Sequence, residues 1–332
     1  MRKNKGFIQL LLTFSILALI LAGCGANNTA SNNGTGENSS KDNDAVKTEE
    51  STEYTVQHAM GETTIEDTPK KVVVLTNEGT EAVLELGVTP VGAASPGVGT
   101  EWYAHIKEQM EGVTELGEET APNLETIASL QPDLIIGNKI RHEEIFEQLE
   151  AIAPTVFSED LAGDWKQNFE LYAKALNKEA EGKEAMAKYD KHVEEVKGKL
   201  SDKLDMEVSV VRFLPTTVRI YQKDTFAGTI LSDLGFARPE AQDKENFMEV
   251  ITEEQMSSMD GDVMFYFNAD YDEEKGGTKM QEAWMQHPLY EKLNVAQTDS
   301  AYKVDEIIWN LSGGIKAANL LLEDIVKYME EM

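Results

Sequence analysis

The chain has 332 residues, a formal net charge of −30 at pH 7 and a hydrophobic content of 41%. This acidity excludes a nucleic acid partner, because phosphate groups would be repelled. The single cysteine, Cys24, excludes a disulfide within the chain and argues against a redox or thiol-metal site. The length suits two domains or lobes.

Residues 1–23 have the pattern of a lipoprotein signal peptide. A short positive region precedes an apolar stretch from Phe7 to Leu21, which is short for a helix that spans a membrane. The stretch ends in Leu21-Ala22-Gly23-Cys24, where small residues precede a cysteine. We expect cleavage before Cys24 and its lipidation by acyl chains such as palmitate, which would anchor the protein to the outer face of the cell membrane. An ordinary cleavage site that happens to precede a cysteine is the alternative.

Residues 24–52 are rich in Asn, Ser, Gly, Thr, Glu and Lys and contain almost no large apolar side chain. Such a segment cannot bury enough surface to offset the entropy of ordering it. We therefore expect a disordered tether that gives the folded part reach.

The segment 53–162 shows alternating strand and helix patterns and is expected to form an N-terminal lobe. Lys71–Leu75 is a continuous apolar run, which is typical of a buried parallel strand. A helix then ends at Leu86, with Gly87 after it, and residues 91–94 read as the next strand. Asn123 is expected to cap a helix that ends at Leu130, and residues 132–137 form a turn and a strand. This alternation predicts an α/β fold with a mainly parallel sheet.

The segment 203–332 repeats these patterns and is expected to form a C-terminal lobe. Residues 208–211 read as a strand and Phe226–Gly235 as a helix that again ends in Leu-Gly. Residues 125–136 and 254–265 align without a gap, each with the pattern Glu, polar, apolar, small, Ser, apolar, polar, turn residue, Asp and three apolar residues. One helix-turn-strand unit in each half predicts two similar lobes. Chance similarity between such units is the alternative.

The segment 163–202 connects the two halves and has apolar residues at helical spacing. It predicts one long linker helix, with a break between Asn177 and Gly182 as an alternative. An amphipathic helix is expected from Leu311 to Met332. The predicted fold is therefore α/β, with two similar lobes, each a mainly parallel sheet with flanking helices, joined by one long helix.

Motifs of catalysis and of metal binding are missing from the sequence. It contains no glycine-rich phosphate loop, no HExxH pair and no Gly-x-Ser-x-Gly elbow. The five histidines are scattered singly, so no metal site is predicted. We expect a protein that is not an enzyme.

Arginines near the ends of strands are the candidate binding residues. Arg141 follows the strand that ends at Gly137, and ligands of α/β sheets bind outside the carboxyl ends of the strands. Arg212 ends a strand of the C-terminal half, and Arg219 and Tyr221 share one face of the extended segment after it. Arginine holds carboxylate or hydroxamate oxygens through a planar fork. A surface ion pair with one of the many acidic residues is the alternative for each arginine.

Aromatic and amide side chains in other predicted loops or at helix starts complete the candidate site. Aromatic faces pack against flat ligands, so Trp102, Phe226 and Trp309 are candidates. Packing in the core is the alternative for Phe226 and Trp309. Asn77, in the polar loop after the first strand, is a further candidate.

Three groups of motifs between Tyr54 and the C-terminus are similar to those of one known family. They are Pro122-Asn123-Leu124-Glu125 with Leu130-Gln131-Pro132-Asp133-Leu134-Ile135, then Val210-Val211-Arg212-Phe213 with Arg219-Ile220-Tyr221 and the segment 227–235, and finally Trp309-Asn310. With these motifs the chain resembles the ferric-siderophore substrate-binding lipoproteins of bacterial ABC importers, which have the class III periplasmic-binding-protein fold. The group around Pro122 is shared with corrinoid and haem binders, whereas the group around Arg212 resembles that of proteins that bind hydroxamate or citrate-based siderophores.

The resemblance implies capture of an anionic ferric hydroxamate or citrate–hydroxamate chelate, in which the siderophore supplies all ligands of Fe(III) and the protein needs no cofactor. It implies a monomer that delivers its ligand to an ABC permease with its ATPase, and docking of Glu125 and Glu254 onto permease arginines. Ferrichrome-type relatives have a ligand-contacting arginine shortly before Pro122, whereas residues 118–121 here are Glu-Glu-Thr-Ala. That departure shifts the expectation to Arg141, Arg212 and Arg219.

Other functions of the same fold stay open. A haem or corrinoid binder would need an axial ligand in the cleft, for which Met248 and His142 are conceivable. A direct Mn²⁺ or Zn²⁺ binder would need converging His and carboxylate ligands. A lipid-anchored hydrolase would need a nucleophile beside a base, and a lipid-anchored sensor or interaction module would need no permease.

Overall fold

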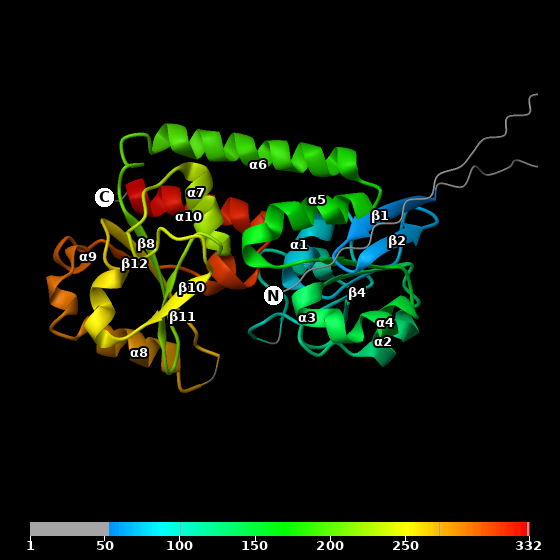
Figure 1. The fold of residues 1–332 in the computed structure, drawn as a ribbon, viewed down its shortest axis with the longest axis horizontal. Helices are drawn as coiled ribbons and strands as arrows, with labels where there is room; N and C mark the ends of the chain where they lie inside the picture. The colour runs from blue at the N-terminus through cyan, green and yellow to red at the C-terminus, as the bar shows by residue number, and fades with distance from the viewer. Residues whose placement is uncertain (1–52, 100, 272, 331) are drawn as a thin grey trace, which may run out of the picture. The chain divides into compact units, whose positions relative to one another are not determined.

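The computed structural model describes residues 53–99, 101–271, 273–330 and 332. These residues belong to one unit, which contains two five-stranded sheets and one two-stranded hairpin (Figure 1). The expected signal peptide, Cys24 and the expected tether lie outside the described residues. Among the helices of the described residues, none has the length and apolarity needed to cross a membrane.

The sheet of the N-terminal lobe is entirely parallel, with the order β5-β4-β3-β6-β7. Its strands are β3 (Val72–Val74), β4 (Gly92–Ala93), β5 (Thr114–Glu115), β6 (Leu134–Asn138) and β7 (Thr155–Ser158). The helices of this lobe are α1 (Asn77–Glu85), η1 (Lys107–Met110), α2 (Leu124–Leu130), α3 (Lys139–His142), η2 (Glu143–Ile145), α4 (Phe146–Glu150) and η3 (Ala162–Asp164). Asn123 caps α2 by accepting a hydrogen bond from the backbone N–H of Thr126, as predicted.

A hairpin that the sequence did not lead us to expect precedes this sheet. Strands β1 (Tyr54–His58) and β2 (Gly61–Ile65) pair antiparallel, and Gly61, at φ 128°, lies at the turn. The backbone N–H of Ala59 donates to the carbonyl of Phe157, which attaches the hairpin to β7 (3.0 Å). The hairpin thus packs on the edge of the N-terminal sheet.

The sheet of the C-terminal lobe has the order β10-β9-β8-β11-β12 and is mixed. Its strands are β8 (Val208–Phe213), β9 (Val218–Tyr221), β10 (Met248–Ile251), β11 (Val263–Asn268) and β12 (Ala301–Lys303). Strand β9 is antiparallel to both β8 and β10, whereas β8, β11 and β12 are parallel. The connection from β8 to β9 is a tight turn, closed by the hydrogen bond from the N–H of Leu214 to the carbonyl of Thr217. Such a short connection permits only antiparallel pairing.

The helices after the N-terminal lobe complete the fold. They are α5 (Trp165–Ala175), α6 (Glu179–Lys199), α7 (Phe226–Leu234), η4 (Glu253–Met259), α8 (Gly276–Met285), η5 (Tyr290–Lys292), α9 (Asn294–Gln297), the π-helical turn η6 (Ile307–Leu311) and α10 (Ile315–Glu330). Helix α7 ends at Gly235 with φ 80°, as the Leu-Gly pattern predicted.

The two aligned segments of the sequence occupy equivalent places in the two sheets. Helix α2 leads into β6, which pairs with β3, and η4 leads into β11, which pairs with β8. Strands β6 and β11 each lie fourth in the order of their sheet. The two lobes are therefore similar, as predicted, although the helix of the C-terminal segment is a 3₁₀ helix.

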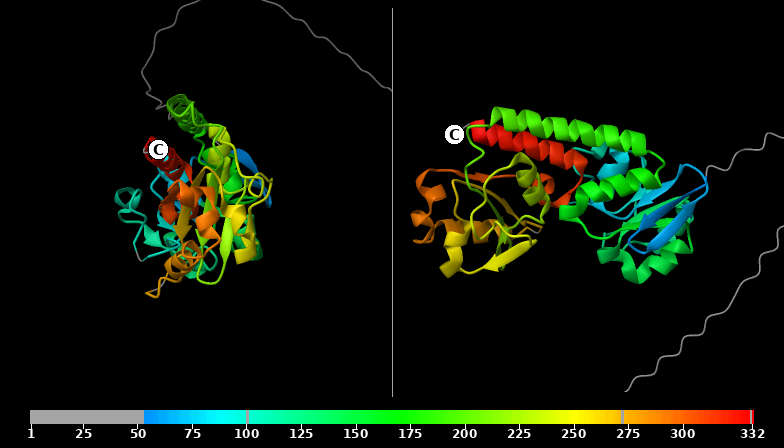
Figure 2. Two further views of the ribbon diagram at one scale, coloured as in Figure 1. Left: turned by 90° about the vertical axis from the view of Figure 1, so that its left-hand side faces the viewer. Right: turned by 45° about the horizontal axis from the view of Figure 1, so that its top comes forward.

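The linker consists of two helices, which corresponds to the alternative of a break between Asn177 and Gly182. Asn177 has φ 55°, a left-handed conformation that separates α5 from α6. Helix α6 has 21 residues, which corresponds to a length of about 31 Å, and it runs beside α10 across both lobes (Figures 1 and 2). Helix α10 begins at Ile315 rather than Leu311, because Gly313, at φ 70°, follows the turn η6.

One hydrophobic core extends through both lobes. Alternate residues of β3 contribute to opposite faces of their sheet, and Val72 and Val74 pack in the same cluster as Val208 and Val210 of β8. Helices α1, α5, α6, α7 and α10 also contribute to this cluster, as do further strands such as β6 and β11. At the junction, the backbone N–H of Ala317, in the first turn of α10, donates to Oε2 of Glu81 on α1 (2.9 Å).

Candidate functional site: a polar cavity between the lobes

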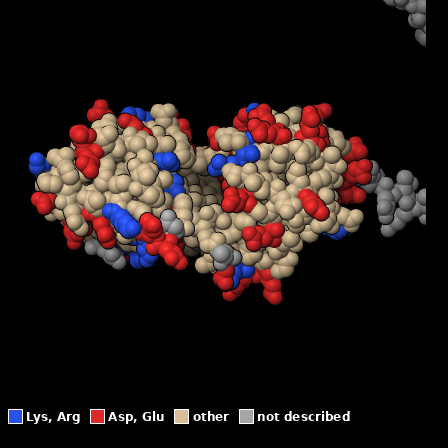
Figure 3. Space-filling model, turned by 90° about the horizontal axis from the view of Figure 1, so that it is seen from below, with Lys and Arg blue, Asp and Glu red and all other residues tan. Residues whose placement is uncertain are grey.

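A cavity of about 980 Å³ lies between the lobes, at the carboxyl ends of the strands. Loops after β3, β4, β5, β6 and β7 form its N-terminal wall, and strands β8 and β9 with residues 310–313 form much of the other wall. The surface seen from below is hollowed at this place, with basic and acidic side chains at its walls (Figure 3). Five of the candidate ligand-binding residues line it, namely Asn77, Arg141, Arg212, Arg219 and Tyr221.

Arg219 is the cation of this cavity with the fewest partners. It lies on β9, between the buried residues Val218 and Ile220, and is half-buried. Its Nε atom is buried and has no hydrogen-bond partner in residues 53–99, 101–271, 273–330 and 332. Within the described part of the chain, its guanidinium forms no hydrogen bond and no ion pair. An uncompensated guanidinium in a cleft is a binding group for an anion, since its planar fork matches carboxylate and hydroxamate oxygens.

Arg212 lies beside Arg219 but is compensated within the protein. Its Nη2 is 2.6 Å from Oε1 of Glu306, and the two side chains are only 11% and 10% exposed. The same guanidinium donates to the hydroxyl groups of Tyr221 (3.2 Å) and Tyr271. Burial raises the pKa of Glu306, and the positive charge of Arg212 opposes this shift. Arg212 therefore holds two tyrosines at the cavity.

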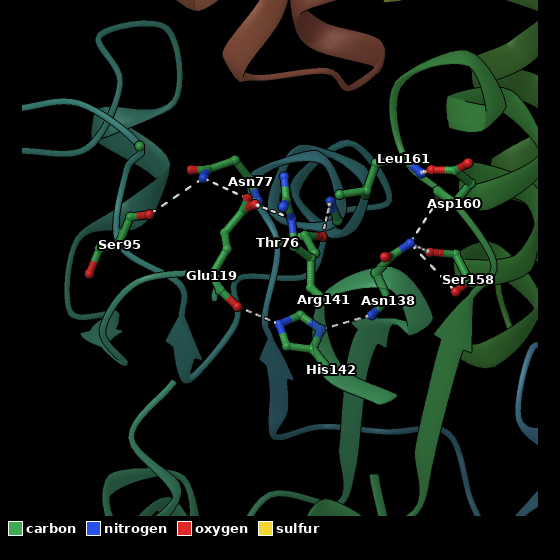
Figure 4. A network of polar contacts seen from close by, with 12 residues as sticks. Thr76, Asn77, Ser95, Glu119, Asn138, Arg141, His142, Ser158, Asp160 and Leu161 are labelled. Carbon is green, nitrogen blue, oxygen red and sulfur yellow. Dashed lines mark hydrogen bonds and ion pairs between the residues drawn. The ribbon is translucent and has the colours of Figure 1, made fainter. Parts of the chain in front are cut away.

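Arg141 is exposed on the opposite wall. It lies in the short helix α3, directly after β6, and its Nε is 3.9 Å from Oε2 of Glu119, with side-chain exposures of 42% and 21% (Figure 4). A pair at that distance is weak in water. The guanidinium of Arg141 can therefore turn to another anion.

Glu119 is held at the beginning of α1. The backbone N–H and the Nδ2 group of Asn77 both donate to its Oε1, over 2.6 and 2.8 Å (Figure 4). The hydroxyl group of Thr76 caps the same helix by accepting from the N–H of Gly79. Sequence reasoning missed Glu119, because one acid among 60 acidic residues carries no signal.

His142 is buried beneath this loop, and both of its ring nitrogens are engaged. Nε2 donates to the carbonyl of Glu119 (2.6 Å) and Nδ1 accepts from the backbone N–H of Asn138 (3.1 Å). Burial lowers the pKa of His142, so the neutral ring is favoured. The ring is thus a structural clamp, and it has no free nitrogen to offer as an axial ligand of haem.

Glu78 was also missed, although it lines the cavity and is only 5% exposed. Its Oε1 accepts from Nδ2 of Asn168 (2.7 Å), whereas its buried Oε2 has no hydrogen-bond partner among the residues that the structure describes. Burial raises the pKa of Glu78 to about 8, and the charge of Glu119 adds to this shift. The carboxyl group is therefore mostly protonated at neutral pH.

Three aromatic candidates do not line the cavity. Phe226 and Trp309 are fully buried in the shared core, and Nε1 of Trp309 donates to Asp324 (3.0 Å). Trp102 packs against the small cluster around Leu84 and Tyr103. The expectation that these three aromatic residues contact the ligand is therefore corrected. Phe226 lies in α7 and Trp309 in η6, and both helical segments direct these side chains into the core. The aromatic residues at the cavity are Tyr103, Tyr221, Phe247 and Tyr271, and only Tyr221 was predicted.

The two expected docking residues lie on the surface, away from the cavity lining. Glu125 is exposed in the first turn of α2, and Glu254 is exposed in the first turn of η4. Each precedes an equivalent strand of its lobe. In the described ranges, no group of three or more His, Cys, Asp and Glu residues is arranged to hold a metal ion.

A model of the family described as "Periplasmic binding protein" matches residues 72–307. The chain belongs to the periplasmic binding protein family. It is 45% identical over 332 residues to "Probable siderophore-binding lipoprotein YfiY" of Bacillus subtilis (strain 168), covering 98% of each chain. It is 31% identical over 327 residues to "Fe(3+)-citrate-binding protein YfmC" of the same organism, covering 98% of this chain and 97% of that one.

Two solved structures of other proteins have the same fold. Staphylococcus aureus SirA complexed with staphyloferrin B matches with a TM-score of 0.78 and 33% identity, over 83% of this chain and 98% of that chain. The Bacillus subtilis protein FeuA complexed with Ferri-Bacillibactin matches with a TM-score of 0.71 and 22% identity, over 84% of this chain and 98% of that one. The chain is thus a two-lobed α/β substrate-binding protein, of a transport family rather than an enzyme family, and such a protein acts outside the cytoplasm.

Proposed function

We propose that this periplasmic binding protein is the receptor of an ABC importer that captures an anionic ferric siderophore of the hydroxamate or citrate–hydroxamate type. The observation that carries the proposal is Arg219, a half-buried guanidinium without an ion pair among the described residues, on the wall of a cavity of about 980 Å³. In a chain of net charge −30, an unpaired cation in a cleft selects anions. The 45% identity to a protein named as a probable siderophore-binding lipoprotein supports the choice of anion.

The three arginines would contribute differently to ligand binding, because their ion-pair partners differ. Arg219 would bind the chelate first, because it has no internal ion pair to give up. Arg141 would follow, because its pair with Glu119 is long and partly exposed. Arg212 would act mainly through Tyr221 and Tyr271, because its charge is already neutralised by Glu306. The siderophore would supply all oxygen ligands of Fe(III). The protein would therefore need no cofactor and would not coordinate the iron.

Delivery would use surfaces outside the cavity. Glu125 and Glu254 project from equivalent places on the two lobes and would dock onto arginines of a permease that works with its ATPase. We propose that the protein acts as a monomer, cleaved after residue 23 and anchored through lipid on Cys24. Residues 24–52 would be the tether, 53–162 and 203–332 the lobes, and 163–202 the linker between them.

A titration of the non-lipidated chain that begins after Cys24 tests the proposal. Intrinsic tryptophan fluorescence is followed while ferric schizokinen, ferrioxamine, ferrichrome, ferric citrate, haem, cobalamin, Mn²⁺ and Zn²⁺ are added separately. We expect saturable quenching at submicromolar concentration by a ferric hydroxamate or citrate–hydroxamate chelate. Saturation only by haem, cobalamin or a bare metal ion, or by nothing in the panel, would overturn it.

A further inference from the structure

The carboxylate of Glu119 occupies a place in the cavity that is built for an anion. Its Oε1 accepts from the backbone N–H and from Nδ2 of Asn77, and its Oε2 faces Arg141 at 3.9 Å (Figure 4). The backbone N–H belongs to the first residue of α1, a nine-residue helix whose positive end favours negative charge. Donors from α1 and α3 thus converge on one carboxylate inside the cavity.

Glu78 is a second group at this end of the cavity whose hydrogen bonding is incomplete. It is the next residue of α1 and lines the same cavity at 5% exposure, and its Oε2 has no hydrogen-bond partner among the described residues. Burial favours the protonated form of this carboxyl group. A protonated Glu78 brings an O–H donor that needs an acceptor, because a buried donor without one is costly.

The Glu119 side chain can leave this place while its backbone stays. Nε2 of His142 donates to the carbonyl of Glu119, and His142 is itself fixed by the N–H of Asn138. The side chain is 21% exposed, so a rotation would bring the carboxylate into water. An incoming anion would then meet the same donors without movement of the loop.

We propose that Glu119 is an internal placeholder whose carboxylate is exchanged for a carboxylate of the ferric chelate when the ligand binds. The exchange leaves Asn77 and Arg141 with an anionic partner in both states, so no buried donor loses its acceptor. This inference rests on the proposed function and narrows it. The substrate would present one anionic group to Arg219 on the C-terminal wall and a carboxylate to Asn77 and Arg141 on the N-terminal wall, as a citrate-containing siderophore can and a simple trihydroxamate cannot.

Ferric schizokinen, which contains citrate, is the probe for the test, and Glu119→Gln is the variant. Glutamine has the shape of glutamate and keeps a neutral acceptor for Asn77. Because it carries no charge, a carboxylate of the ligand should displace it more easily. We expect the affinity to rise about tenfold, which corresponds to the strength of one charge-assisted hydrogen bond. Glu118→Gln is the matched control, because this exposed neighbour lines the same cavity and the change removes the same charge. If Glu119 only repelled the anionic ligand through its charge, both variants would gain affinity equally.

A double-variant cycle shows whether Glu119 and Arg141 compete for the ligand. Arg141→Gln is expected to lower the affinity about threefold in the native chain and at least tenfold in the Glu119→Gln background, where Arg141 has no internal partner. Equal losses in both backgrounds, a lower affinity of Glu119→Gln, or equal gains from Glu118→Gln would overturn the placeholder role. Failure of the native chain to bind any ferric chelate is a different result, which overturns the proposed function itself.

Discussion

Arg212 and Arg219 lie directly opposite each other on the antiparallel strands β8 and β9. Directly opposed side chains point to the same face of a sheet, and like charges placed in this way destabilise it. Glu306 neutralises Arg212, whereas Arg219 has no such partner among the described residues. Arg219 therefore presents to the cavity a positive charge that no ion pair among the described residues compensates.

Arg219→Gln should change affinity and stability in opposite directions. We expect affinity for the ferric chelate to fall by about 2 kcal/mol, because a charge-assisted contact is lost. The ligand-free protein should gain about 0.5 kcal/mol of stability, because the like-charge pair is relieved. Fluorescence titration and urea unfolding measure the two effects. Lys244→Gln, at an exposed pair with Glu249 outside the cavity lining, is the control and should leave affinity unchanged. A variant that binds as tightly as the native chain would contradict the role of Arg219.

Glu306→Gln should destabilise the fold, because it leaves the buried charge of Arg212 beside Arg219 without compensation. Removal of one partner of a buried pair costs about 3 kcal/mol, and Glu306 is only 10% exposed. Urea unfolding without ligand measures the loss. Glu249→Gln breaks an exposed pair with Lys244 and should cost less than about 1 kcal/mol. Equal losses in the two variants would show that Arg212 does not depend on Glu306.

Glu78 should make the protein less stable as pH rises. Its pKa is about 8 in the folded chain against an ordinary value of 4.5, so the folded state binds more protons than the unfolded state between these values. The contribution of this group to the free energy of unfolding is fully present below pH 4.5 and is lost as pH rises through about 8. The groups that face it are Glu119, Asp164 and Tyr172.

Glu78→Gln removes this titration and keeps the acceptor for Asn168. We expect the variant to match the native chain near pH 5 and to exceed its stability at pH 9 by on the order of 4 kcal/mol. Urea unfolding at pH 5, 7 and 9 measures the difference, and Glu118→Gln provides the same series for an exposed acid. A stability difference that does not vary with pH would exclude Glu78 as its source.

Glu125→Ala combined with Glu254→Ala should separate binding from delivery. Both residues are exposed and lie outside the cavity lining, so the affinity for the chelate should stay within about twofold. Uptake of the radiolabelled ferric chelate by cells should be abolished, because surface charges guide docking. Glu253→Ala, at the exposed neighbouring position, is the control. Normal uptake in cells that carry the double variant would contradict a role of Glu125 and Glu254 in docking.

Much of the fold could be predicted because its signals are local. Runs of apolar residues indicated β3 and β6, and Asn123 and Gly235 mark helix ends through their capping geometry. Arg141 and Arg219 line the cavity. Arg141 directly follows β6, and Arg219 pairs with Arg212 near the carboxyl end of β8, which is where α/β sheets bind their ligands. The hairpin of β1 and β2 was missed, since its strands are short, polar and only partly buried.

The remaining site residues depend on tertiary contacts that no local pattern encodes. Phe226 and Trp309 have the sequence context of ligand aromatics, yet the direction of their helical turns carries them into the core. Glu78 and Glu119 are acids in an acidic chain, and only their burial and their partners distinguish them. Phe247 and Tyr271 reach the cavity from loops that flank the C-terminal sheet.

The hydrophobic cluster shared by β3 and β8 has a consequence for how this chain can change. Because one face of each sheet packs in this shared cluster, the two halves should unfold in a single cooperative transition and not one after the other. Chimaeras that join one half to the matching half of a relative would have to repack helices α1, α6 and α10 together. New ligand preferences are therefore more accessible to this scaffold through its cavity loops than through exchange of whole lobes.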